Sequence, residues 1–207
     1  MEQVIEISQK LTATREQPTR GQQANTKTLA VLTKWFEIDI CDDPQIASMV
    51  QAAGDYAKAI RDGKQPHWLV ILGKSGNGKT HVCNRIWRWV VSKCLDGSQG
   101  SEYLPHRIYW PDFVDELKGG SAYGKFNDMK RWPYLFIDDA WANRTSDFSE
   151  DKLNTLLGCR AGKWTMITAN STMQAIAGRD VRIASRFLRD GCKLIDIRTT
   201  DYNRRNG

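Results

Sequence analysis

The chain alternates between short apolar runs and longer stretches in which apolar residues recur at steps of three and four. The apolar runs predict strands that are buried on both faces of a sheet. They cover 67–72, 106–110, 134–140, 163–170 and 192–197. The stretches with helical periodicity cover 80–95, 111–119, 148–162 and 179–191, and 123–132 is a polar helix or a connection. Strands that alternate with helices predict an α/β fold, a parallel sheet covered by helices on both faces.

The part of the chain before the first predicted strand has a different character. Residues 1–26 are rich in Gln, Thr and Arg and have little apolar periodicity, which indicates a weak helix followed by a flexible linker. A short helix is expected over 26–38, and a clearer one begins at Asp43, which can cap a helix whose first turn holds a proline. We therefore predict a short N-terminal helical extension over 1–42, partly flexible and a candidate partner-binding segment, ahead of one domain over 43–207.

The stretch GKSGNGKTH, residues 73–81, stands between the first predicted strand and the first helix of that domain. It contains the pattern G-x-x-x-x-G-K-[ST], in which glycines let backbone N–H groups curl around an anion, the lysine reaches the β/γ-phosphates and the hydroxyl binds Mg²⁺. An ordinary Gly-rich turn is the weaker alternative, because a strand precedes the loop and a helix follows it. We predict that the loop binds ATP with Mg²⁺. The predicted contacts are Gly73, Lys74, Ser75, Gly76, Asn77, Gly78, Lys79, Thr80 and His81, with Lys79 also catalytic and Thr80 also a metal ligand.

Two carboxylates end the third predicted strand, in LFIDDA. Ligands of parallel sheets bind at the carboxyl ends of the strands, so these side chains are expected beside the Gly-rich loop. Asp138 would hold Mg²⁺, and Asp139 would orient or deprotonate an attacking water. The alternative is a strand end with no chemical role.

The fourth predicted strand ends in MITAN, with Asn170 at the same edge. An amide there can hold the water or a γ-phosphate oxygen without adding charge, so Asn170 is a candidate catalytic residue. The alternative is a cap for a helix in the residues that follow, and the two roles are not exclusive.

The composition indicates a basic protein and the cellular compartment in which it is expected. The net charge is +6, and the excess lies beyond residue 60, where 24 Lys/Arg face 16 Asp/Glu. That distribution suits a polyanion such as DNA, although a solvated basic face has the same composition. Five cysteines without a C-x-x-C argue against a disulfide framework and a zinc site. The N-terminus lacks the layout of a signal peptide and no long apolar run occurs, so we expect a soluble, cytoplasmic protein with no membrane partner.

Eight tryptophans are many for a chain of this length, and aromatic rings can stack on unpaired bases. Those within predicted strands and helices are expected in the core, namely Trp68, Trp87, Trp89 and Trp164. Those at the ends of predicted elements are the better stacking candidates, namely Trp110, Trp132 and Trp141.

The order of the motifs, GKSGNGKTH, LFIDDA, ITAN and then RIASRFLRDG, resembles the AAA+ ATPases of the helicase-loader and transposition-helper branch, the DnaC and IstB type. The resemblance covers about residues 44–200. Its specific details are a histidine after the loop threonine, Asp-Asp in place of the more usual Asp-Glu, and a serine–arginine pair in the last helix. It implies an AAA+ P-loop NTPase domain. We expect no C-terminal helical lid, because the chain ends soon after the last predicted strand.

The same resemblance implies an ATPase that forms homo-oligomers with ATP, touches single-stranded DNA and delivers a partner, which for loaders is a hexameric replicative helicase. Arg186 matches the arginine finger that acts on a neighbouring subunit's ATP, and Arg182, one turn earlier, is a second candidate. The simpler alternative pairs Arg186 with Asp190, four positions further on.

Several functions stay open at this point. A helicase loader explains RIASRFLRDG, whereas a small viral-type DNA helicase shares the other motifs without requiring that one. Our prediction is the helicase loader, and a transposition helper of the IstB type, with a transposase as its partner, is a further alternative. A module that binds ATP without hydrolysing it is disfavoured, because the lysine, threonine and paired acids are all present. The short segment ahead of the ATPase domain leaves the identity of the partner open.

Overall fold

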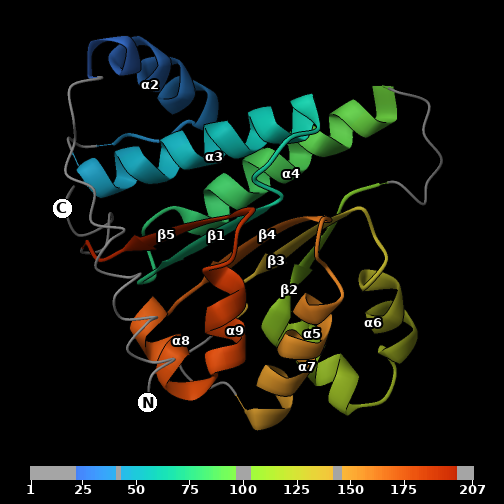
Figure 1. Cartoon of the computed structure of the whole chain (residues 1–207). Helices are drawn as coiled ribbons and strands as arrows, with labels where there is room; N and C mark the ends of the chain where they lie inside the picture. Colours follow the sequence, from blue (N-terminus) through green and yellow to red (C-terminus); the bar gives the residue numbers. More distant parts are fainter. Residues whose placement is uncertain (1–21, 41–42, 97–103, 142–145, 200–207) are drawn as a thin grey trace.

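The computed structural model describes residues 22–40, 43–96, 104–141 and 146–199. Five strands form one parallel sheet in the order β2-β3-β4-β1-β5 (Figure 1). They are β1 (Trp68–Gly73), β2 (His106–Tyr109), β3 (Tyr134–Asp138), β4 (Trp164–Ala169) and β5 (Cys192–Ile197). Each coincides with a predicted strand apart from small shifts at its ends. The predicted parallel α/β sheet is therefore confirmed.

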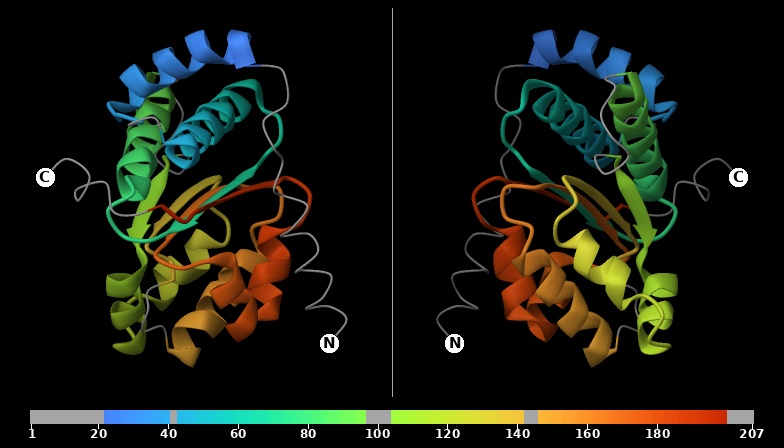
Figure 2. Two further views of the ribbon diagram at one scale, coloured as in Figure 1. Left: turned by 90° about the vertical axis from the view of Figure 1, so that its left-hand side faces the viewer. Right: turned by 90° about the vertical axis from the view of Figure 1, so that its right-hand side faces the viewer.

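Helices cover both faces of the sheet, as the views in Figures 1 and 2 show. One face carries α3 (Pro44–Asp62) and α4 (Lys79–Asp96), and α2 (Gln22–Phe36) lies outside these two helices. The other face carries α5 (Trp110–Lys118), α6 (Tyr123–Met129), α7 (Asp147–Gly158), α8 (Met173–Arg179) and α9 (Val181–Phe187). Within the described residues, no helix has both the length and the apolar character that a membrane span requires.

The central strand β1 explains the unbroken apolar runs of the sequence. Leu69 and Ile71 pack into the core beneath α3 and α4, whereas Val70 and Leu72 pack into the core on the opposite face. Every residue of β1 is buried. A strand with a core on each side has no polar face, so the alternation typical of half-exposed strands is absent.

The helices α2 and α3 form as their sequences predict. The Asp43 carboxylate caps α3 by accepting from the Gln45 N–H at 2.8 Å, and α3 ends at Gly63 with a left-handed backbone. The helix expected over 26–38 is observed as α2, which begins earlier. A Cβ at Gly54 of α3 would lie 2.6 Å from the Leu32 side chain of α2, so the glycine lets these helices meet without a shift of that leucine. The predictions for 1–21 lie outside the described residues.

The helix predicted over 179–191 is observed as α9, which is shorter at both ends. The helix α8 precedes it in the residues that follow Asn170, and Asp180 lies between the two helices with an extended backbone. The Asp180 carboxylate accepts from the N–H groups of Arg182 and Ile183, and it thereby starts a new helix at a point where the apolar periodicity continues without interruption.

A buried arginine stabilises the amino-terminal edge of the sheet, the edge opposite the Gly-rich loop. Arg160 is 0% exposed and no carboxylate contacts it in the described part of the chain. Its guanidinium donates to the Met129, Trp132 and Trp164 carbonyls and to the Thr165 hydroxyl, at 2.6–3.0 Å. Burial lowers the pKa of Arg160 to about 10, so it keeps its proton near neutral pH. One side chain thus fixes the connections that lead into β3 and β4.

We expect Arg160→Met to lower the free energy of unfolding by about 3 kcal/mol or more, because three carbonyls lose a charged donor inside the protein. Urea unfolding followed by circular dichroism measures the change. Arg131→Met is the matched control, since Arg131 is exposed and pairs only with Asp128 in its own helical region. Equal unfolding midpoints for the two variants would contradict this role of Arg160.

Candidate functional site

The Gly-rich loop joins β1 to α4 and depends on glycine for its shape. Gly73, Gly76 and Gly78 have φ angles of 147°, 82° and 78°, a region that side chains disfavour. A Cβ at Gly73 would also lie 2.5 Å from the Ile197 carbonyl oxygen of β5. The loop therefore turns tightly against the neighbouring strand and leads directly into the first turn of α4. The predicted sequence of strand, loop and helix is confirmed.

Lys79 is buried at the start of α4, and its Nζ donates to the Lys74 carbonyl of the loop at 2.5 Å. Burial lowers the pKa of Lys79 to about 8, while the Asp139 and Asp138 carboxylates act in the opposite direction. A cation held with one backbone carbonyl inside the loop is suited to bind an anion that enters it. The side chain of Asn77 donates to the Thr199 carbonyl at 3.2 Å, and its contact with a ligand stays a prediction.

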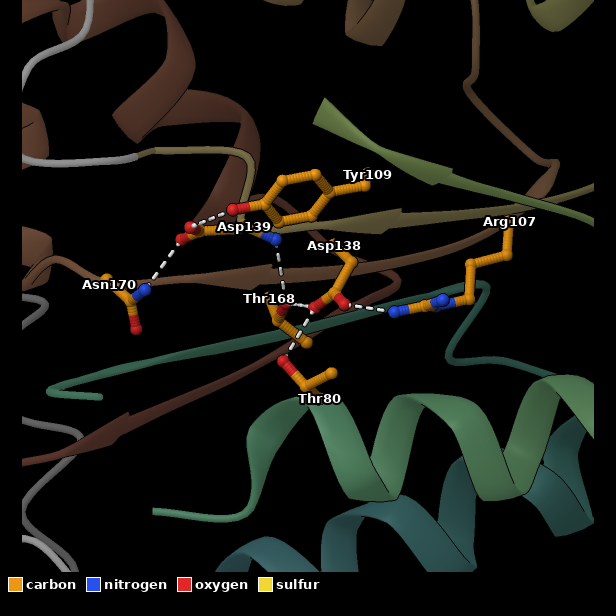
Figure 3. A network of polar contacts seen from close by, with 7 residues as sticks. All are labelled: Thr80, Arg107, Tyr109, Asp138, Asp139, Thr168 and Asn170. Carbon is orange, nitrogen blue, oxygen red and sulfur yellow. Dashed lines mark hydrogen bonds and ion pairs between the residues drawn. The ribbon is translucent and has the colours of Figure 1, made fainter. Parts of the chain in front are cut away.

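Asp138 is the centre of the polar network shown in Figure 3. It ends β3 and is 1% exposed. Its Oδ1 accepts from the hydroxyls of Thr80 at 3.0 Å and Thr168 at 2.5 Å, and its Oδ2 accepts from the Arg107 guanidinium. The network thus joins α4, β4 and β2 to the end of β3. Sequence reasoning brought Thr80 and Asp138 together but missed Arg107 and Thr168.

The donor set around Asp138 is compatible with Mg²⁺. Thr80 and Asp138 present oxygen atoms, the ligands this ion prefers. Among the residues that the structure describes, no cluster of three His, Cys, Asp or Glu could enclose a metal by itself. Such a site suits an ion that keeps several waters and takes other ligands from phosphates. Thr80 and Asp138 are the side chains that would hold it.

Asp139 directly follows β3 and has a left-handed backbone, with φ of 54°. Its N–H donates to the Thr168 hydroxyl at 3.0 Å, which fixes the backbone turn. The carboxylate accepts from the Asn170 amide at 2.8 Å and from the Tyr109 hydroxyl at 3.5 Å. Partial burial, with the nearby Asp138 charge, raises the pKa of Asp139. A partly buried carboxylate with a raised pKa is suited to accept a proton.

Asn170 follows β4 and points its amide at Asp139 (Figure 3). The alternative role as a helix cap falls to Thr172, whose hydroxyl accepts from the Ala175 N–H at the start of α8. The side chain of Asn170 therefore belongs to the polar site.

A cavity of about 240 Å³ lies beside the loop. It is lined by segment 37–39, which lies between α2 and α3, by Ile46, by residues 76–78 of the loop and by His81. These residues form a mixed apolar and polar hollow at the Gly-rich loop. Sequence reasoning did not find segment 37–39, because a short acidic connection carries no recognisable motif.

The first turns of α4 also connect the loop to α2. His81 Nε2 lies 2.5 Å from the Phe36 carbonyl, and Arg85 donates to the Trp35 carbonyl at 3.1 Å. Arg85 further pairs with Glu37 at 3.0 Å. These contacts fix the carboxyl end of α2 and the cavity wall that follows it. His81, predicted as a ligand contact, therefore has a structural partner as well.

The two candidate arginines of α9 have different surroundings. Arg182 is exposed and pairs with Asp180 at 2.9 Å. Arg186 is partly buried, and its Nε donates to the Asn154 side chain of α7 at 3.2 Å. The alternative pair of Arg186 with Asp190 does not form in the described structure. Neither arginine joins the network around Asp138.

The structure agrees with the predictions for the core tryptophans but not with those for two of the stacking candidates. Trp68 lies in the core on the face that carries α5 to α9. The partly buried tryptophans pack against the core beneath α3 and α4, and they are Trp87, Trp89 and Trp164. Two of the stacking candidates are wrong, because Trp110 and Trp141 are only 1% and 3% exposed. Their side chains belong to the hydrophobic core, just after β2 and β3. The third, Trp132, is partly buried and stacks on the His106 ring, with centroids 3.6 Å apart.

Comparison with known proteins finds similarity to a replication initiator and, in fold, to solved structures. No protein-family model matches the chain. The chromosomal replication initiator protein DnaA of Nitrosospira multiformis is 29% identical over 149 residues, which are 68% of this chain and 30% of that protein. The chain thus matches about a third of the length of this relative.

Three solved structures share the fold. The crystal structure of DnaI has a TM-score of 0.60 at 21% identity, covering 82% of this chain and 92% of that one. The DnaC helicase loader has a TM-score of 0.59 at 17% identity, covering 75% and 92%. The replication initiator DnaA bound to AMPPCP and single-stranded DNA has a TM-score of 0.54 at 20% identity, covering 73% and 46%. The five-stranded parallel sheet and its helices therefore form an AAA+ P-loop NTPase fold.

Proposed function

We propose that this chain is an ATP-dependent DNA replication factor, a helicase loader that binds and hydrolyses ATP with Mg²⁺, assembles on single-stranded DNA and delivers a replicative helicase. The observation that carries the ATPase part is the meeting of Lys79, Thr80, Asp138, Asp139 and Asn170 at one edge of the sheet. These side chains come from three separate stretches of the sequence.

In the proposed reaction the Gly-rich loop and Lys79 bind the phosphates, and the cavity beside segment 37–39 accepts the nucleoside. Mg²⁺ at Thr80 and Asp138 supplies charge neutralisation on the phosphate oxygens. Asp139 orients the attacking water and accepts its proton while the water oxygen bonds to the γ-phosphorus and ADP leaves. Asn170 fixes the Asp139 carboxylate for that step through the 2.8 Å hydrogen bond.

Replication is favoured over transposition by the names of the similar proteins, a chromosomal replication initiator and a helicase loader. A loader is favoured by the higher TM-scores for DnaI and DnaC than for DnaA. Strand separation by the purified protein alone would instead support the viral-type helicase.

Arg186 is the better of the two finger candidates in this proposal. The neighbouring Arg189 stacks on Trp68, the first residue of β1, with 3.9 Å between the guanidinium and the ring centroid. Arg186 therefore lies toward the edge of the sheet opposite the protein's own loop, so a nucleotide that it contacts belongs to another subunit. Arg182 is already paired with the cap of its own helix.

The paired variants Lys79→Ala and Asp139→Asn test the ATPase. We expect Lys79→Ala to lose ATP binding, because the loop loses the charge that meets the β/γ-phosphates. Asp139→Asn should retain ATP binding and slow hydrolysis by about 10²-fold or more, because the amide cannot accept the proton. Equilibrium binding and phosphate release are measured on both. Asparagine suits the left-handed backbone at this position, so a fold defect is not expected. Wild-type behaviour of both variants would refute the site.

Binding to single-stranded DNA is expected to weaken steeply with salt and to depend little on base sequence, because backbone phosphates meet an excess of Lys and Arg beyond residue 60. Fluorescence anisotropy with labelled oligonucleotides at several salt concentrations, with ATP present, measures this. A flat salt response, or no binding at low salt, would remove DNA from the proposal.

Arg186→Ala should leave ATP binding by the monomer intact and reduce both hydrolysis and ATP-dependent assembly, an arginine finger being worth about 10³–10⁵ in rate. Mixing this variant with Lys79→Ala should restore part of the activity, since one variant supplies the nucleotide pocket and the other the arginine. Arg182→Ala is the matched control on the same helix. If no mixture exceeds the separate variants while the wild type assembles, the role in trans is wrong.

A further inference from the structure

Arg107 occupies a position that the ATPase site as described does not require. It is on β2, at the edge of the sheet, and pairs in register with Phe136, two residues before Asp138. Its side chain runs along the α4 side of β3 and places the guanidinium on Asp138 Oδ2 (Figure 3). The arginine side chain is 27% exposed and the aspartate 2%. A largely buried fixed cation therefore contacts the proposed metal-binding carboxylate.

The two oxygens of Asp138 have different partners. Oδ1 accepts two hydroxyl hydrogen bonds, from Thr80 and Thr168. Oδ2 accepts from Arg107. A cation that approaches this carboxylate from the loop therefore meets one oxygen used by hydroxyls and another already paired with a positive charge.

The surroundings of Arg107 indicate that Asp138 is what holds it. Among the described residues, Asp138 is the carboxylate that contacts the guanidinium. The nearby Cys83 offers no negative charge, because burial raises the pKa of its thiol. The Arg107 Nε is buried without a hydrogen-bond partner. Arg160, by comparison, has a partner for Nε and for both terminal nitrogens.

We propose that Arg107 is a positioning residue that competes with Mg²⁺ for the Asp138 carboxylate and thereby raises the Mg²⁺ concentration needed for tight nucleotide binding. The proposal rests on the proposed function, since it assigns a property to the same site. When no metal is bound, the guanidinium compensates the buried carboxylate. When Mg²⁺ binds, two positive centres lie near one carboxylate and their repulsion weakens the metal.

Charge-changing variants at this position separate the competition from a packing role. Arg107→Gln and Arg107→Met remove the charge, whereas Arg107→Lys keeps it. The affinity of a fluorescent ADP analogue is measured over free Mg²⁺ from micromolar to millimolar. We expect the Mg²⁺ midpoint to fall roughly tenfold in the two neutral variants, the size of shift that one charge at 4–6 Å produces in a titration. Arg107→Lys should stay near the wild type.

Arg179→Gln is the matched control, because Arg179 pairs with Glu150 on the other helical layer, and its Mg²⁺ midpoint should not change. Thermal unfolding without nucleotide is the second readout. Both neutral variants should melt below the wild type in EDTA, and Mg²⁺ alone should raise their melting temperature more than that of the wild type. Either neutral variant that folds is sufficient for the test.

Equal Mg²⁺ midpoints for the wild type and a folded neutral variant would overturn the proposal. An equal shift in Arg107→Lys would also overturn it, since packing and not charge would then be responsible. Failure of the wild type to bind the ADP analogue at any Mg²⁺ concentration would instead refute the proposed function, and this inference with it.

Discussion

The burial of one carboxylate, Asp138, organises the edge of the sheet beside the Gly-rich loop. A charge that is 1% exposed is costly unless every oxygen is compensated. Compensation comes from a hydroxyl at the start of α4, a hydroxyl on β4 and a guanidinium on β2. Each donor reaches Asp138 only if its strand pairs with β3 in the observed register or, for α4, if the helix begins beside the end of β3. The network therefore links the order of the strands to the position of the loop.

The opposite edge of the sheet uses a buried charge of the other sign. Arg160 binds backbone carbonyls that lead into β3 and β4, without a carboxylate partner in the described chain. Arg160 donates mainly to backbone carbonyls, whereas Asp138 accepts from two hydroxyls and a guanidinium. The two ends of the strands thus differ in kind, one held by contacts to the backbone and the other by contacts between side chains.

The strands and the Gly-rich loop could be predicted because their causes are local. Burial on both faces requires apolar runs, and the turn at Gly73 requires glycine. Contacts between strands could not be predicted, because they depend on strand order and register, which placed Arg107 beside Asp138. A polar residue within a short buried strand, such as Thr168, was the available signal. The helix predicted over 179–191 was too long, because apolar periodicity alone did not show that Asp180 caps α9 with an extended backbone.

The backbone at Asp139 restricts which acid can serve at the end of β3. Left-handed φ angles are several-fold enriched for Asp and Asn among residues with side chains, since a short polar side chain can bond locally there. A glutamate would carry one more rotatable bond from a backbone that suits it less, and its carboxylate would extend past Asn170 and Tyr109. The Asp-Asp pair is in this sense matched to the turn. The length of the acidic side chain and the left-handed backbone at position 139 therefore depend on each other. A substitution that changes one of them is expected to require a change in the other.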